Sequence, residues 1–475
     1  MSVINLLPSP HQYYTLAASL LQSTFDNYTR RPIEKRVSPV DFDVDVETGF
    51  FPRSPLPRLP GVFDIWEGAL SDASDKLSLG EDDSEEALSK RDSGELWRSR
   101  VLSWPVIDTA PLHSNLRLLQ RAHFVLAWLV HYYVHSAPSS AEDSAFVVPQ
   151  SLAVPLVAVS RQLGIAPVLT FADTVLWNWE VIEASEPRSF ENMRFGVHLF
   201  SGTEDERNFY TTSARAEWRG IEMLRIIDEY NNLPNLSDLT SISKVARDLG
   251  RLTGIINDIS DIIQAVRGVV DPHVFYWDLR PWFEGSDAKG PDAPGWIYEG
   301  VPDSKSLDLS GPSAGQSSVM HALDIFLDID HKLRQRRSPA PSDSNKRADH
   351  GFMERMRRYM PGKHREYLAS LAATPRSIRE LAQRTPALRE PYDNAVLALK
   401  KLRDLHMRIA CLYVVTMSRT TPNAFAACPV AHAMERMQRA RASGDGPTRG
   451  TGGNELSLLL KAGRDATRRA VLKGN

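Results

Sequence analysis

The chain has 475 residues, of which 42% are hydrophobic, so it is long for one core and can bury a sizeable interior. Its 56 Lys and Arg are balanced by 59 Asp and Glu, which excludes the basic footprint of a nucleic-acid-binding protein. No stretch resembles a transmembrane span or a secretory signal, and the two cysteines, Cys411 and Cys428, are too few for a disulfide framework. We therefore expect a cytoplasmic protein without nucleic-acid or membrane partners.

The first 200 residues predict a small, mostly helical region. Residues 72–98 are acidic and nearly free of aromatic side chains, a composition typical of a disordered surface insertion. Apolar helices are expected at 115–133 and 151–163. His131 and His135 have i, i+4 spacing, but no carboxylate lies between them as in the HExxH pattern, so a metal site there is disfavoured.

A Ser-Gly turn and a run of charge within 190–208 mark the joint between two domains. We predict a small N-terminal domain over 1–203 and a large helical domain over 204–475. In the latter, helices are expected at 209–231 and at 239–270, where apolar residues recur at unbroken three-four spacing. Because strands are scarce, the fold class is mainly α.

One histidine completes an apolar stripe near the C-terminus. Within 394–413 the apolar residues recur at steps of four and three: Ala395, Leu399, Leu402, Ile409 and Tyr413. His406 occupies the missing position of this stripe, so its imidazole should face the interior. Spacing alone favours a core histidine bonded to a carbonyl, and a metal or haem-iron ligand is the alternative.

Two further stretches suggest ligand contacts. The long irregular segment 284–318 ends in LSGPSAGQSS, whose small residues indicate close backbone approach. Gly450, Thr451, Gly452 and Gly453 directly precede a helix, where backbone N–H groups can bind an anion, although a plain flexible cap is equally compatible. Cys428-Pro429 near His432 could form a haem-responsive site, but it lies in a variable stretch and is disfavoured.

Four segments together carry a family resemblance. They are PHVFYWDLRPWFEG (272–285), SGPSAGQSSVMHALDIF (310–326), RRYMPGKHREYL (357–368), and RDLHMRIACLYV (403–414) paired with GTGGNEL (450–456). In this order and spacing they closely resemble the indoleamine 2,3-dioxygenase family, haem enzymes that open the indole ring of L-tryptophan. The N-terminal half agrees more loosely, through VDVETGFFP, LAVPL and PVLTFADTVLWNW. The resemblance covers nearly the whole chain.

The resemblance implies a site built around haem b, with ferrous iron for activity. His406 matches the proximal iron ligand, and Arg403 and Asp324 match a pair that supports the proximal side. Ala314 and Gly315 match the haem edge. The distal pocket residues implied are Phe171, Thr174, Val175, Phe209, Tyr210, Ser213 and Phe275.

The same resemblance assigns the substrate contacts and the reaction. Arg280 matches the arginine that pairs with the substrate carboxylate, and Thr451 lies in the loop that closes over the amino-acid end. Ser213 and Arg280 are the candidate catalytic residues. The implied partners are L-tryptophan or a related indole and O2, the product is N-formylkynurenine in the first step of the kynurenine pathway, and the expected state is a monomer.

Two departures from the family pattern bear on turnover. The usual Gly-Gly before Ser-Ala-Gly is Gly311-Pro312 in this chain, which fixes one φ angle. Tyr210 and Thr174 are also more polar than the common pocket residues. Two alternatives therefore stay open: a haem-binding sensor or scaffold with little turnover, and a dioxygenase acting on a modified indole in secondary metabolism.

Overall fold

The computed structural model describes residues 38–138, 145–288, 295–331, 351–420 and 456–472. Contacts divide the chain into two units, Met1–Asp41 and Phe42–Asn475. In the described part of the first unit, the backbone N–H of Ser38 donates to Asp41 Oδ2 at 3.0 Å. The helices and strands considered below lie in the second unit, and the domain boundary at residue 203 stays a prediction.

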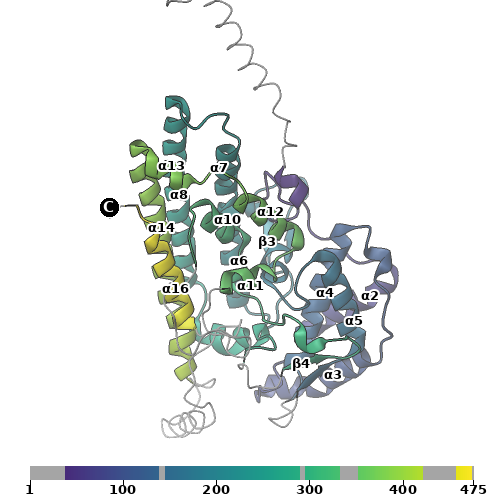
Figure 1. Cartoon of the computed structure of the whole chain (residues 1–475). Helices are drawn as coiled ribbons and strands as arrows, with labels where there is room; N and C mark the ends of the chain where they lie inside the picture. Colours follow the sequence, from purple (N-terminus) through teal and green to yellow (C-terminus); the bar gives the residue numbers. More distant parts are fainter. Residues whose placement is uncertain (1–37, 139–144, 289–294, 332–350, 421–455, 473–475) are drawn as a thin grey trace, which may run out of the picture. The chain divides into compact units, whose positions relative to one another are not determined.

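The second unit is mainly α, which confirms the predicted fold class (Figure 1). Its α-helices are α2 (Asp64–Lys76), α3 (Glu85–Leu102), α4 (Leu116–His135), α5 (Gln150–Leu163), α6 (Glu204–Arg219), α7 (Ile221–Asn231), α8 (Leu239–Ala265), α9 (Pro272–Val274), α10 (Ser318–Phe326), α11 (Phe352–Arg357), α12 (Gly362–Ala372), α13 (Ile378–Arg384), α14 (Pro386–Ala410) and α16 (Leu456–Arg469). In the described ranges, none of the helices has both the length and the apolar character needed to cross a membrane.

Four short strands form two small sheets. β1 (Phe146–Val148) pairs in parallel with β4 (Trp296–Tyr298), and β2 (Trp179–Val181) pairs antiparallel with β3 (Met193–Phe195).

Helices α8, α14 and α16 lie side by side (Figure 1). The predicted apolar stripe of α14 is confirmed, since Ala395, Leu399 and Leu402 are buried. α8 begins at Leu239, where the Asp238 side chain accepts a hydrogen bond from the backbone N–H of Ser241 and so caps the helix. It ends at Ala265 and passes into a 3-10 turn, somewhat earlier than the spacing predicts.

The predicted helix over 209–231 is two helices, α6 and α7, that meet at Gly220. Gly220 packs against Val319 so closely that a Cβ atom there would lie 2.3 Å from Val319 Cγ1. Glycine is thus required by contact with α10, a tertiary contact that the helical period does not reveal.

The prediction that residues 72–98 are disordered is wrong. α3 covers most of it, begins with Ser84 accepting from the backbone N–H of Ala87, and buries Trp97 and Val101. The Trp97 indole N–H donates to the carbonyl of Ala69 at 3.1 Å. The acidic helix α3 packs against α2 and α5 through its few buried residues, of which Trp97 is the largest.

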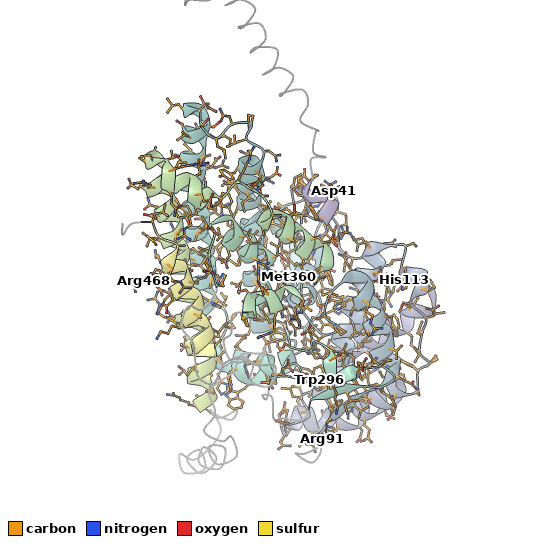
Figure 2. All side chains as sticks on the ribbon, viewed as in Figure 1. Asp41, Arg91, His113, Trp296, Met360 and Arg468 are labelled. Atoms are coloured by element: carbon orange, nitrogen blue, oxygen red, sulfur yellow. The ribbon has the colours of Figure 1, made fainter. Side chains whose placement is uncertain are left out.

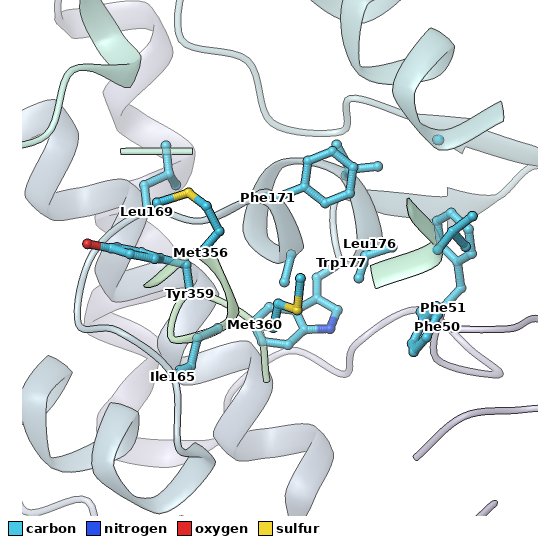
Figure 3. Packing of buried hydrophobic residues seen from close by; sticks show 14 of the residues in the cluster. Phe50, Phe51, Ile165, Leu169, Phe171, Leu176, Trp177, Met356, Tyr359 and Met360 are labelled. Carbon is cyan, nitrogen blue, oxygen red and sulfur yellow. The ribbon is translucent and has the colours of Figure 1, made fainter. Parts of the chain in front are cut away.

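The interior of the second unit is filled by side chains from segments far apart in the sequence (Figure 2). In Figure 3, Leu169 and Ile165 lie beside Met356, Tyr359 and Met360. The backbone N–H of Ala166 donates to the carbonyl of Arg358 at 3.0 Å, which joins the two segments. Phe171 continues from this packed segment into the wall of the cavity described next.

Candidate functional site

A cavity of about 300 Å³ lies inside the second unit, near the lower end of the range of about 300–1,000 Å³ usual for ligand pockets. Its walls come from α6, α8, α14, α16, the segment 171–175, the segment 275–283 and the loop 312–320. Most lining side chains are apolar. The site residues predicted from the sequence that line it are Phe171, Thr174, Val175, Phe209, Ser213, Phe275, Arg280, Ala314 and His406.

Aromatic rings form one wall of the cavity. The Phe209 and Phe275 ring centroids lie 4.9 Å apart, and Phe275 also packs edge-on against Tyr413 at 5.6 Å. Ser213 follows Phe209 by one helical turn, so both face the cavity, and its hydroxyl donates to the Phe209 carbonyl at 3.1 Å. The hydroxyl oxygen still has acceptor capacity toward a ligand.

Tyr210 corrects one of the predicted contacts. It is not among the residues that line the cavity, and its hydroxyl donates to Glu206 Oε1 at 2.7 Å inside the core. Residue 210 lies one position further around α6 than Phe209, and its ring packs toward Trp128 and Phe283 instead. The phenol therefore belongs to the supporting core.

Arg280 is the strongly basic side chain among the described lining residues. It starts a 3-10 turn, Arg280–Phe283, and its Nη1 donates to Glu284 Oε1 at 2.6 Å. Its guanidinium carbon lies 5.3 Å from the centroid of the Tyr276 ring. The arginine is thus oriented from two sides while it contributes to the wall.

His406 lines the cavity from α14, as the stripe predicts. Burial, and then the nearby charge of Arg403, lower the pKa of His406 below its ordinary value. The imidazole is neutral at neutral pH, which is the form that binds a metal ion. Within the described part of the chain, no hydrogen bond joins this ring to a carbonyl, so the core-histidine interpretation lacks its expected partner.

Arg403 and Asp324 form an ion pair behind His406, although neither lines the cavity. Arg403 Nη2 lies 2.6 Å from Asp324 Oδ1 and 2.7 Å from Oδ2, and His331 Nε2 lies 2.7 Å from Oδ2. Although burial alone would raise the pKa of Asp324, the Arg403 and His331 charges hold it well below its usual range. Arg403 also donates to Thr467, which fixes α16 against α14.

The small-residue loop makes the close approaches expected of it. A Cβ atom at Gly311 would lie 1.8 Å from the carbonyl oxygen of Phe283, so this position requires glycine. Pro312, the departure from the family pattern, lines the cavity directly. Gly315 does not line it, and its Cα instead packs near Phe352 and Met356 beside Ala314.

Glu217 is the functional candidate that the sequence reasoning missed. It lines the cavity one turn beyond Ser213, is 3% exposed, and accepts a hydrogen bond from the Ser317 hydroxyl. Burial raises the pKa of Glu217 to about 7. Its position two turns beyond Phe209 on one helix face was the available signal.

The histidines of α4 support the site from behind. His131 Nδ1 donates to the Trp282 carbonyl at 2.7 Å, and His135 Nε2 donates to the Glu284 carbonyl at 2.8 Å. His123 binds Asp173 through Nδ1 at 2.9 Å and so anchors the turn that carries Thr174. Among the residues with described positions, no group of three or more His, Cys, Asp or Glu could hold a metal ion.

Several predicted positions lie outside the described residues. These are Thr451 with its glycine neighbours and the Cys428, Pro429 and His432 group. Residues 335–349, whose basic, Ser- and Pro-rich composition indicates an insertion, also lie outside the described residues.

The fold and the cavity define a mainly α protein with a largely apolar cavity that is lined by one neutral histidine and one arginine. The sequence pattern of the family described as Indoleamine 2,3-dioxygenase matches residues 38–470. The chain therefore belongs to the indoleamine 2,3-dioxygenase family, a family of dioxygenases within the oxidoreductases.

Individual relatives agree with this assignment. Indoleamine 2,3-dioxygenase 1 of Rattus norvegicus is 28% identical over 434 residues, covering 91% of this chain and 95% of that protein. Indoleamine 2,3-dioxygenase of Saccharomyces cerevisiae is 29% identical over 374 residues, covering 74% and 78%. The 6-hydroxytryptophan 2,3-dioxygenase of Fusarium equiseti is 28% identical over 390 residues, covering 81% and 86%.

Proposed function

We propose that this chain is a haem-dependent dioxygenase that opens the indole ring of L-tryptophan with O2 to give N-formylkynurenine. The observation that carries the proposal is the neutral His406 imidazole in an apolar cavity whose lining also includes the paired Phe209 and Phe275 rings and Arg280. We further propose that the protein acts in the cytoplasm as a monomer.

The residues present fit haem. His406 offers a neutral ring nitrogen to iron, and the rest of the cavity lining is mostly apolar, as the face of a macrocycle requires. The Arg403–Asp324 pair fixes the α14 and α10 helices behind that histidine. When bound, ferrous haem supplies the binding and activation of O2.

The chain's own residues hold and orient the substrate. Phe209 and Phe275 provide faces and edges for packing an indole. Arg280 offers a planar fork for the carboxylate, and the apolar lining excludes water from the reacting ring. The Ser213 hydroxyl donates to the Phe209 carbonyl and can accept one hydrogen bond from the substrate, while Thr451 stays a candidate for closing the amino-acid end.

The test uses the purified full chain loaded with haem. L-tryptophan and a reductant are added under air, and the absorbance of N-formylkynurenine should appear. The variant His406→Ala should lose both product and the Soret band, whereas the matched variant His113→Ala, at an exposed position, should keep them. An unchanged Soret band in His406→Ala contradicts the proposal, and haem binding without product favours the sensor or scaffold alternative.

A second candidate substrate class is a ring-modified tryptophan. Thr174, Thr212 and Glu217 add polar groups to the cavity wall, and these could bind a substituent on the indole. The Fusarium relative, which is 28% identical to this chain, is named a 6-hydroxytryptophan 2,3-dioxygenase, and this supports the second class. Comparing kcat/KM for tryptophan and hydroxytryptophans on the same preparation separates the two classes.

A further inference from the structure

Tyr210 packs directly behind the aromatic wall of the cavity. Its ring centroid lies 6.2 Å from that of Phe209 and 6.0 Å from that of Phe283, and both phenylalanines line the cavity. Phenols and indoles are the aromatic side chains that give up an electron most readily, whereas the phenyl rings of the wall do not. An oxidant formed in the cavity is therefore separated from an oxidisable phenol by one layer of rings.

The Tyr210 hydroxyl has a base beside it. It donates to Glu206 Oε1 at 2.7 Å, and this carboxylate also accepts from the backbone N–H groups of Phe200 and Ser201. Burial raises the pKa of Glu206, so a proton that arrives there neutralises a charge that the interior disfavours. Tyr210 can thus lose an electron and its proton together, and no charge is left on its ring.

Tyr413 lines the cavity itself but lacks such a base. Its hydroxyl donates to the carbonyl of Val270 at 2.7 Å, and a backbone carbonyl does not hold a proton at neutral pH. Removal of an electron from Tyr413 would leave a positive charge in a largely apolar site, which costs free energy. Of these two tyrosines, Tyr210 is therefore the one that is easier to oxidise.

A series of oxidisable rings continues from Tyr210 through α4. The ring centroids of Tyr210 and Trp128 lie 6.5 Å apart, those of Trp128 and Tyr132 6.3 Å, and those of Tyr132 and Trp282 5.4 Å. Phe200 stacks on both tryptophans, at 4.0 Å and 5.3 Å, and so fills the space between them. Each oxidisable ring thus has the next one as a packing neighbour.

The series ends at a partly exposed tryptophan. The His135 ring lies 6.3 Å from Trp282 and 5.8 Å from Trp296, so it connects the two indoles. Trp282 is buried, whereas Trp296 on β4 is only partly buried (Figure 2). A solute can therefore exchange an electron with Trp296 without entering the cavity.

We infer that Tyr210, with Glu206 as its proton acceptor, is a redox-active tyrosine that supplies electrons to an oxidant formed in the cavity, and that the rings behind it refill it from Trp296. The oxidant is hydrogen peroxide reacting at haem iron, so the inference rests on the haem of the proposed function. Its role is to spare the cavity wall from oxidation.

The electrons and protons balance as follows. One hydrogen peroxide takes up two electrons and two protons from solvent as its O–O bond breaks, and two waters form. Each electron leaves Tyr210 while the phenolic proton moves to Glu206 Oε1, which gives a neutral tyrosyl radical. An electron that arrives through Trp128 and Trp282 restores the phenol, and the proton returns to it. A small reductant in solution, such as ascorbate, is finally oxidised at Trp296.

The test uses the full chain loaded with ferric haem and mixed with hydrogen peroxide in the absence of reductant. Electron paramagnetic resonance of frozen samples made with deuterated tyrosine should identify a tyrosyl radical, and mass spectrometry should find oxidised Trp296. Tyr210→Phe should lose the tyrosyl signal and the oxidation of Trp296, and its Soret band should bleach faster. Trp282→Phe should keep the tyrosyl signal and lose only the oxidation of Trp296.

The matched control is Tyr298→Phe. Tyr298 and Tyr210 are both 1% exposed, but the Tyr298 hydroxyl donates to the Pro167 carbonyl instead of a carboxylate, so this variant should behave as wild type. A tyrosyl signal that persists in Tyr210→Phe, or its absence from wild type, overturns the role of Tyr210. Unchanged oxidation of Trp296 in Trp282→Phe overturns the path to the surface.

Failure of the inference and failure of the proposed function give different results. If the wild-type protein forms N-formylkynurenine but peroxide gives no tyrosyl radical that depends on Tyr210, only the inference fails. If the haem-loaded protein forms this radical but no N-formylkynurenine, the inference stands and the proposed reaction fails.

Discussion

The Gln316 side chain joins two walls of the cavity through one amide group. Its Oε1 accepts from the backbone N–H of Phe171 at 2.8 Å, and its Nε2 donates to the carbonyl of Gly311 at 2.9 Å. The side chain is only 2% exposed, so water does not replace either bond. The aromatic segment that begins at Phe171 is thus held to the loop that carries Pro312 and Ala314.

Gln316→Ala should destabilise the protein by about 2–4 kcal/mol, because a buried N–H and a buried C=O both lose their partner. It should also weaken tryptophan binding, since Phe171 is released from the loop. Urea unfolding measures the first effect and calorimetry the second. Gln264→Ala, at an exposed position of α8, should change stability by less than about 0.5 kcal/mol. Equal effects of the two variants would contradict the role of Gln316.

Asp324→Asn should lower the free energy of unfolding, because it leaves Arg403 without its buried counter-charge. The side chains are 5% and 14% exposed, and we expect a loss of about 3–5 kcal/mol together with weaker haem retention as α16 loosens. The control lies on the same helix as Arg403: Asp404→Asn breaks the more exposed pair with Lys400 and should cost about 0–1 kcal/mol. Urea unfolding and the rate of haem loss to a scavenger protein check both expectations.

The sequence predicted the parts of this site that depend on local pattern or residue type. The apolar stripe of α14 placed His406 correctly, because burial of a helix face leaves a periodic trace. The sequence did not predict that the helix over 209–231 is interrupted at Gly220, since the cause is contact with Val319 from another segment. Trp97 was overlooked because the acidic composition around it dominates the average.

Tyr210, which the sequence assigned to the pocket, and Glu217, which it did not single out, differ from expectation for the same physical reason. Their roles depend on which neighbours reach them: Glu206 binds the Tyr210 hydroxyl inside the core, and Ser317 binds Glu217 inside the cavity. Only the three-dimensional arrangement of α6 and the loop decides this.

Buried histidines should make the folded protein sensitive to acid. Burial lowers the pKa of His131 to about 3 and the pKa values of His198, His321 and His364 to about 4. Below the ordinary value of 6.5, the unfolded chain binds protons that the folded chain does not, so stability should fall as the pH drops from 6.5 toward 4. Urea unfolding across this range measures the slope.

The contribution of one histidine can be isolated with His364→Leu, because His364 is buried against the Phe50 ring. Its removal should make the loss of stability between pH 6 and 4.5 shallower by about 1 kcal/mol per pH unit. His113→Gln, at an exposed position, is the control and should leave the slope unchanged. A slope in His364→Leu that matches wild type would show that this histidine does not resist protonation.

Glu217 should make the folded protein less stable as the pH rises, whereas the buried histidines make it less stable as the pH falls. Because its folded pKa is about 7 and its ordinary value is 4.5, the folded protein holds a proton that the unfolded chain releases as the pH rises between these values. Its stabilising contribution is complete below pH 4.5 and is lost as the pH passes 7. Glu217→Gln keeps a neutral group that bonds Ser317, so this variant should gain about 1–3 kcal/mol over wild type at pH 8 and nothing at pH 4.5.

The control for Glu217→Gln is Glu206→Gln, which changes the other buried glutamate of α6. Glu206 accepts hydrogen bonds from the backbone N–H groups of Phe200 and Ser201, which an amide nitrogen cannot accept. Glu206→Gln should therefore lower the stability of the protein at every pH. Glu217→Gln, in contrast, should only remove the pH dependence of stability that Glu217 causes. If Glu217→Gln behaves like Glu206→Gln at pH 8, then Glu217 is held as a carboxylate, and the raised pKa of this cavity-lining group is refuted.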